Sequence, residues 1–323
     1  MRALLLLLLI ATCAPCSAAA PRFPSVPSYA WPGPFVQEDY LPFDSTEIAR
    51  FARLHVTRIE ARRSDLPKEV VIYTLDAAGQ PILETTMEQN GQRTITTSEQ
   101  SWSYDGAGRM LSRVLYAQGR LDNYDSVRYD AQGRIVYHVW WLSGGRKHRK
   151  NEVKGITERT NVTWQPDGTG RRCMVSLPIA PADTAPTCDL LTADAHGQVV
   201  LVRSGNRIDS LAADVVTDTA VIRRIWYRTS PAPTPLLGRE IVMRGGKLRS
   251  CTVYDGDPGR RVAWRQDYSY DEAGQLIRVT EGNGFTTTTF TYYLCGLWDR
   301  VIRVDPTSVV VTRYTYTFGH EGR

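Results

Sequence analysis

The side chains able to do chemistry are 34 acids, five histidines and six cysteines, and their spacing gives no catalytic or metal-binding pattern. The sequence has no Gly-x-Ser-x-Gly elbow, phosphate-binding Gly-x-x-x-x-Gly-Lys loop or His-Glu-x-x-His helix. The histidines are scattered, so no set of metal ligands can be inferred from them: His55, His138, His148, His196 and His320. We therefore expect no cofactor and no metal, and the sequence leaves enzymatic activity undecided.

The N-terminus has the organisation of a secretory signal in residues 1–20. Arg2 precedes an apolar core, and the small residues 17–20 form a cleavage zone. A second interpretation is a lipoprotein signal, in which Cys13 would carry a lipid anchor. Both predict export to the periplasm or the medium, and the lipoprotein form would sit at the outer membrane.

Four cysteines follow the signal: Cys173, Cys188, Cys251 and Cys295. An even number in an exported chain is typical of disulfides. A zinc site is the competing interpretation, but no Cys-x-x-Cys spacing or nearby histidine pair supports it. We expect two disulfides, one closing a Pro-rich loop between Cys173 and Cys188, the other joining Cys251 to Cys295.

One turn pattern recurs five times along the chain. Each copy has an Asp after a strand end, two small or polar residues, a Gly, a long polar residue and apolar residues. The carboxylate can accept backbone N–H groups, and the Gly supplies the left-handed conformation that closes a hairpin. The turn residues are Asp76 and Gly79, Asp105 and Gly108, Asp130 and Gly133, Asp194 and Gly197, Asp271 and Gly274.

The three closest copies, Tyr104–Leu111, Tyr129–Val136 and Tyr270–Ile277, resemble the YD repeats of RHS/YD-repeat proteins. Weaker copies extend the likeness over roughly residues 70–320. This resemblance implies a hairpin-repeat architecture in a secreted bacterial protein. The chain is short, with irregular spacing and no recognisable C-terminal toxin domain, so the resemblance implies a small relative rather than a large shell.

The predicted fold is mainly all-β: an antiparallel hairpin-repeat sheet or meander over residues 44–323, with one short helix near 45–53. A Pro-rich leader covers 21–43, and 228–238 is a candidate long loop. Alternating or β-branched patterns predict strands at 55–62, 69–75, 82–88, 94–104, 110–116, 126–129, 135–142, 198–203, 221–227, 239–244, 248–253, 262–270, 276–281, 286–294, 300–304 and 309–318.

Two features could bind a partner. The basic run Arg146, Lys147, Arg149 and Lys150 is either a solvated loop or a contact for polyanions such as lipopolysaccharide. The tryptophans are either core residues or sugar-stacking surfaces: Trp140, Trp141, Trp226, Trp264 and Trp298. A nucleic-acid partner is not expected, because the basic run lacks interleaved aromatics.

These observations favour an exported, non-enzymatic binding or structural protein of the cell envelope, whose ligand is a protein or a glycan. Three alternatives stay open: an outer-membrane β-barrel, a polysaccharide-active hydrolase, and an accessory protein of a toxin system. Charges within predicted strands, including Arg113, Arg128 and Arg278, disfavour a lipid-facing barrel.

Overall fold

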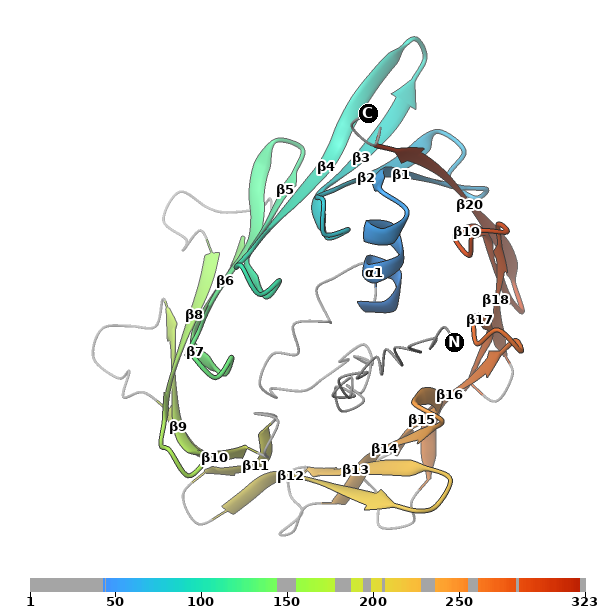
Figure 1. Ribbon diagram of the computed structural model, residues 1–323. Helices are drawn as coiled ribbons and strands as arrows, with labels where there is room; N and C mark the ends of the chain where they lie inside the picture. Colours follow the sequence, from blue (N-terminus) through green and yellow to red (C-terminus); the bar gives the residue numbers. More distant parts are fainter. Residues whose placement is uncertain are drawn as a thin grey trace, which may run out of the picture.

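The chain forms a barrel-like ring of antiparallel strands with one helix inside it (Figure 1). This computed structural model describes residues 43, 45–143, 155–177, 187–193, 199–204, 207–227, 236–254, 261–282 and 285–319. In these residues it has twenty strands, each hydrogen-bonded to the next in sequence, and the last strand pairs with the first. The predicted all-β meander with one short helix is therefore confirmed.

The strands follow the order of the chain around the ring. Their bounds are β1 Val56–Arg63, β2 Glu69–Leu75, β3 Pro81–Asn90, β4 Arg93–Tyr104, β5 Met110–Ala117, β6 Arg120–Tyr129, β7 Ile135–Ser143, β8 Gly155–Trp164, β9 Thr169–Leu177, β10 Thr187–Ala193, β11 Val199–Ser204, β12 Arg207–Val216, β13 Val221–Tyr227, β14 Leu236–Arg244, β15 Lys247–Tyr254, β16 Val262–Tyr270, β17 Leu276–Glu281, β18 Thr286–Tyr292, β19 Trp298–Asp305 and β20 Ser308–Phe318.

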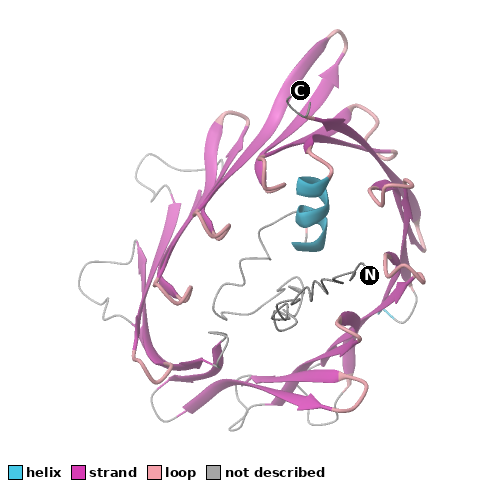
Figure 2. Ribbon diagram, viewed as in Figure 1, coloured by secondary structure: helices cyan, strands magenta, loops and turns pink. Residues whose placement is uncertain are grey.

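The helix α1, Ser45–Arg53, lies inside the ring against the place where the sheet closes (Figure 2). Glu47 in its first turn and Arg50 and Arg53 in its last turn complement the helix dipole. Phe51 and Phe43 pack against Ile59 of β1 in one buried cluster. The predicted helix over 45–53 is thus confirmed. The described part of the chain contains no helix long and apolar enough to cross a membrane.

Strand register shows which side chains face the inside of the ring. Ile59, which packs with α1, is directly paired with Tyr73 of β2 and Tyr316 of β20. Paired residues share a face of the sheet, so the inner face can be followed from strand to strand through the register. Followed in this way, the buried cores on β4–β6, β8–β11 and β14–β16 all lie on the inner face with the α1 cluster.

The outer face carries both charged and apolar side chains; Ile72, for example, is paired with the outward Glu60. The register places exposed arginines outward between inward-facing core residues, as Arg58 beside Ile59 shows. Other exposed outward arginines are Arg128, Arg159, Arg171, Arg203, Arg265, Arg278, Arg300 and Arg313. The buried apolar clusters therefore lie on the inner face, whereas exposed arginines recur on the outer face.

Close packing between α1 and the β2–β3 turn generates a prediction. A Cβ on Gly79 would lie 2.3 Å from the Ile48 backbone oxygen and 2.7 Å from the Ala52 nitrogen. Gly91 also has a positive φ, but nothing lies within 4 Å of its Cβ position. Gly91→Ala should therefore cost only backbone strain, about 1–2 kcal/mol, whereas Gly79→Ala should cost roughly 2–5 kcal/mol because α1 must also move.

The measurement is the free energy of unfolding of both variants by urea titration. Equal losses would mean that α1 does not pack on this turn.

Candidate functional site: the turn ladder and the inner wall

The repeated turns share one set of hydrogen bonds. In the Asp105 turn, the Asp105 N–H donates to the Arg109 carbonyl and the Gly108 N–H donates to the Asp105 carbonyl, both at 2.9 Å. The Asp105 Oδ1 accepts the N–H groups of Ala107 and Arg109, both at 2.9 Å. Gly108 has φ +76°, a conformation that a glycine adopts without strain.

Asp76 and Asp130 make the same pair of side-chain contacts, and Asp271 accepts the N–H of Gln275 at 2.7 Å. The backbone bonds from Arg109 and Ala107, together with the Arg109 guanidinium, hold the pKa of Asp105 below its usual range. These carboxylates are engaged in the turns, as their repeated position predicts. Asp194 and Gly197 lie outside the described residues.

Two further turns have the same backbone bonds without the aspartate. Gln165 and Gly168 form one, with Gly168 at φ +83°, and Tyr293 and Gly296 form the other, with Gly296 at φ +85°. Sequence reasoning missed both, because it searched for the Asp-x-x-Gly pair. The signal that could have found them is the glycine preceded four residues earlier by Trp164 or Tyr292.

Those aromatic residues connect consecutive turns into a ladder along the inner wall. At four of the turns, the residue four positions before the turn glycine donates a hydrogen bond to the carbonyl two positions after the preceding turn glycine. Tyr104 donates to Pro81 at 2.7 Å, Tyr129 to Met110 at 2.9 Å, Trp164 to Ile135 at 2.9 Å, and Tyr292 donates to Leu276 in the same way. Tyr316 adds a bond to Trp298 at 3.0 Å.

The long polar residue after each glycine also reaches the next turn. Gln80 donates to the carbonyl of Gly108 at 2.8 Å. The guanidinium carbon of Arg109 lies 4.7 Å from the ring centre of Tyr129, and that of Arg134 lies 5.0 Å from Trp164. Each is within the range of a cation–π contact. The aromatic residue, the aspartate and the residue after the glycine can therefore each contact either their own turn or a neighbouring one.

Buried polar pairs join neighbouring strands between the apolar clusters. Arg113 of β5 donates two hydrogen bonds to Asp125 of β6, at 3.0 and 2.7 Å, and Asp125 Oδ1 lies 3.3 Å from His138 Nε2. Asp125 is fully buried and His138 is 1% exposed. A buried charge requires a partner, and Arg113 supplies it. A substrate could not reach either group, so this arrangement indicates a structural link.

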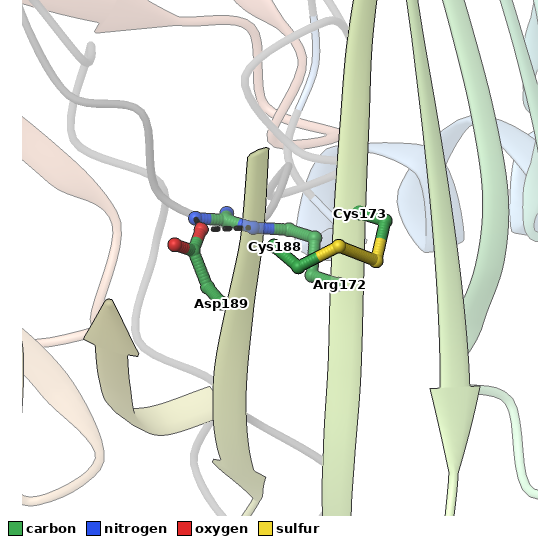
Figure 3. The surroundings of a disulfide bond; sticks show 4 residues. All are labelled: Arg172, Cys173, Cys188 and Asp189. Atoms are coloured by element: carbon green, nitrogen blue, oxygen red, sulfur yellow. Dashed lines mark hydrogen bonds and ion pairs between the residues drawn. A yellow bond between two sulfur atoms is a disulfide. The ribbon is translucent and has the colours of Figure 1, made fainter. Parts of the chain in front are cut away.

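A disulfide and a second ion pair join β9 to β10, and their residues are adjacent in the sequence on each strand (Figure 3). Cys173 and Cys188 form a disulfide between directly paired residues with a Cα–Cα distance of 4.1 Å. Their neighbours Arg172 and Asp189 are paired at 2.6 Å and buried. Because side chains alternate along a strand, the ion pair faces inward and the disulfide outward.

The predicted second disulfide is wrong. Cys251 and Cys295 are free thiols in this structure. Cys251 lies within β15, fully buried against Ile241 and Leu248, whereas Cys295 lies exposed in the turn between β18 and β19. Three strands separate these positions in the sheet, which is too far for a sulfur–sulfur bond. Burial raises the pKa of the Cys251 thiol to about 11.

The remaining predicted sites are the tryptophans, which lie on either face of the sheet, and segments outside the described residues. Trp264 and Trp298 belong to inner clusters, whereas Trp141 and Trp226 face outward by register. Trp140 faces inward, opposite Asp125. The basic run Arg146, Lys147, Arg149 and Lys150 lies outside the described residues, as do the signal in residues 1–20 and all of the 21–43 leader except Phe43. Among the described residues, no group of three His, Cys, Asp or Glu side chains could hold a metal ion.

Comparisons with known proteins give weak similarities of fold. No family model and no curated protein matches the chain. A porin-like protein from Bacteroides uniformis ATCC 8492 has a TM-score of 0.32 at 9% identity, over 81% of this chain and 98% of that one. A porin-like protein from Bacteroides vulgatus ATCC 8482 has a TM-score of 0.27 at 10% identity, over 82% and 98% of the two chains.

The ladder predicts that one hydroxyl contributes measurably to stability. Tyr129→Phe removes the donor to the Met110 carbonyl and should lower the free energy of unfolding by about 1 kcal/mol. Tyr116→Phe is the matched control, because Tyr116 is 40% exposed and lies away from the ladder. Chemical denaturation of both variants checks this, and an equal effect of the two changes would contradict the ladder.

A second prediction concerns alkaline pH. Burial raises the pKa of Tyr129 and Tyr292 to about 12, above the value near 10 of an unfolded tyrosine. Above about pH 10 the unfolded chain releases these protons and the folded chain keeps them, so stability should fall as pH rises through this range and be unaffected below it.

The measurement is the thermal midpoint from about pH 8 to about pH 11. The double variant Tyr129→Phe/Tyr292→Phe should lose stability less steeply than the parent; parallel curves would assign the loss to other groups.

Proposed function

We propose that this chain is an exported, non-enzymatic structural or binding protein of the cell envelope, built from YD-type hairpin repeats, whose ring stands in water. The observation that carries the proposal is the charge on the outer face of the ring. Aromatic and aliphatic clusters face inward, and arginines face outward on both sides of the ring, as Arg128 and Arg278 do.

The energetic argument rests on the outward charges. An arginine on the lipid-facing surface of a membrane barrel costs roughly 2–4 kcal/mol at the bilayer midplane. Membrane barrels accordingly carry an outward apolar band about 25 Å tall and a polar interior. On this ring exposed arginines recur on the outer face, and β1 presents Arg58, Glu60 and Arg62 outward in succession. A wall of this kind is stable in water.

The YD-repeat assignment is supported by the turns. In a typical copy the tyrosine, aspartate, glycine and following polar residue each have a separate contact, as Tyr104, Asp105, Gly108 and Arg109 show. Contacts between successive repeats of this kind stabilise the sheet. A stable sheet of this kind fits a structural or binding role. The partner that we propose is a protein or glycan of the envelope.

An outer-membrane barrel is the second candidate, and ring closure favours it. Membrane barrels are closed antiparallel meanders, mostly with an even number of strands, and the twenty strands described here close in that way. The outward charges oppose it. Fractionation of cells decides between the two.

The water-facing ring should be released from cells by osmotic shock or a high-salt wash. A lipid anchor at Cys13 would retain even a water-facing ring, so Cys13→Ser is the control variant. Release of the parent chain, or of the Cys13→Ser chain alone, supports the proposal. Retention of both until detergent is added would contradict it and favour the membrane barrel.

A further inference from the structure

Several outward arginines elsewhere on the ring have acidic neighbours. Glu60 lies 2.8 Å from Arg58, Glu240 lies 2.9 Å from Arg224, and Asp267 lies 2.7 Å from Arg265. Such exposed pairs contribute little to stability, but each acid offsets the charge of its arginine.

The wall from β7 to β11 differs, at the left and lower left of the ring in Figure 1. Its described outward residues include exposed Arg159, Arg171 and Arg203 and no acidic residue. The acids of these strands, Glu158 and Asp189, face inward by register. The positive charge on this stretch of the outer face is therefore uncompensated by the sheet.

Aromatic and hydrogen-bonding side chains share this surface. Tyr137 and Trp141 of β7 are half-buried on the outer face. The guanidinium carbon of Arg128 lies 5.0 Å from the Tyr137 ring centre. Exposed Asn161 stands directly opposite Tyr137 on β8. We call this surface, made of Arg128, Tyr137, Trp141, Arg159, Asn161, Arg171 and Arg203, the basic face.

The basic face is also held firmly. The Cys173–Cys188 disulfide joins β9 to β10 on the outer face, next in register to Asn161. The buried Arg172–Asp189 pair joins the same strands from inside. A surface whose side chains are held in fixed positions loses less entropy when it binds a ligand.

We infer that the basic face binds an acidic polysaccharide. Arginines would pair with its carboxylates or sulfates, the Tyr137 and Trp141 rings would contact the apolar faces of its sugars, and Asn161 would bind hydroxyl groups. Base stacking in nucleic acids needs a longer row of aromatics. An anionic membrane would require a large exposed apolar surface to insert. Of the described outward aliphatic residues here, Leu190 is 55% exposed, whereas Val139 and Leu201 are half-buried.

The inference rests on the outer face standing in water, and its test uses the purified chain. Dextran sulfate and unsulfated dextran of equal length are the paired probes, and alginate tests carboxylates. We expect binding to dextran sulfate and alginate that weakens with salt, and none to dextran. Binding to dextran alone, or to none of the three, would overturn the inference.

Variants locate the site. Arg159→Ala/Arg171→Ala should weaken binding about tenfold or more, equivalent to 1.4 kcal/mol. The matched control Arg278→Ala/Arg313→Ala removes the same charge from exposed outward positions on β17 and β20 and should leave binding unchanged. Equal losses in both double variants would mean that net charge alone drives binding and would refute the basic face.

Trp141→Ala tests the aromatic contribution, with Asn161→Ala as an exposed variant that should keep the fold. Both should weaken alginate binding several-fold while leaving binding to inorganic polyphosphate unchanged. Tighter binding of a thymidine oligonucleotide or of phosphatidylglycerol vesicles than of alginate would overturn the polysaccharide assignment. Binding is measured on the purified chain, so a failure to bind polysaccharide contradicts only this inference. Retention in the membrane fraction until detergent is added is the result that contradicts the proposed function.

Discussion

The pairing of β1 with β20 is the contact on which the rest of the ring depends. It joins residues about 250 positions apart, from Val56 with Phe318 to Arg63 with Thr312. Closing so long a segment costs entropy that no local contact offsets. The α1 helix covers this seam from inside: Phe51 packs with Ile59 of β1 and Tyr316 of β20, and Arg50 donates to the Gly296 carbonyl at 2.7 Å. The helix and the seam therefore stabilise each other.

Away from the seam, the ring is built from contacts between neighbours in sequence. Each ladder bond spans one repeat, as between Tyr129 and Met110, and each polar pair joins adjacent strands. In repeat proteins, the free energy of unfolding is approximately a sum of terms for each repeat and for each contact between adjacent repeats. A register shift accompanies most turns, for example between Ser103 and Tyr104, and adds one residue to the following strand. This bulge keeps the ladder aromatic and its acceptor on the inner side.

The sequence was informative where structure is local. The helix, the turns and the Cys173–Cys188 disulfide depend on residues close in the chain, and all were predictable. Strands β8, β9, β10 and β12 were missed because their turns lack the Asp-x-x-Gly pair or carry prolines. The Cys251–Cys295 pairing fails because the strands pair in chain order, which puts three strands between the two residues. Ring closure has a different cause. Which distant strands become neighbours depends on the curvature of the whole sheet, and no local pattern records it.

The contacts on the inner face also bear on where a ligand can bind. Several inner-face side chains that could bind a ligand are already engaged: Tyr104 and Tyr129 in the ladder, Asp125 with Arg113, and Asp189 with Arg172. Displacing any of them would leave a buried group unsatisfied. The outer face contributes little to the core, so its composition is free to vary without loss of the fold. The outer surface of β7–β11, which bears arginines and no acids among its described residues, is compatible with that freedom. Ligand binding would then occur on the outer face, while contacts on the inner face stabilise the ring.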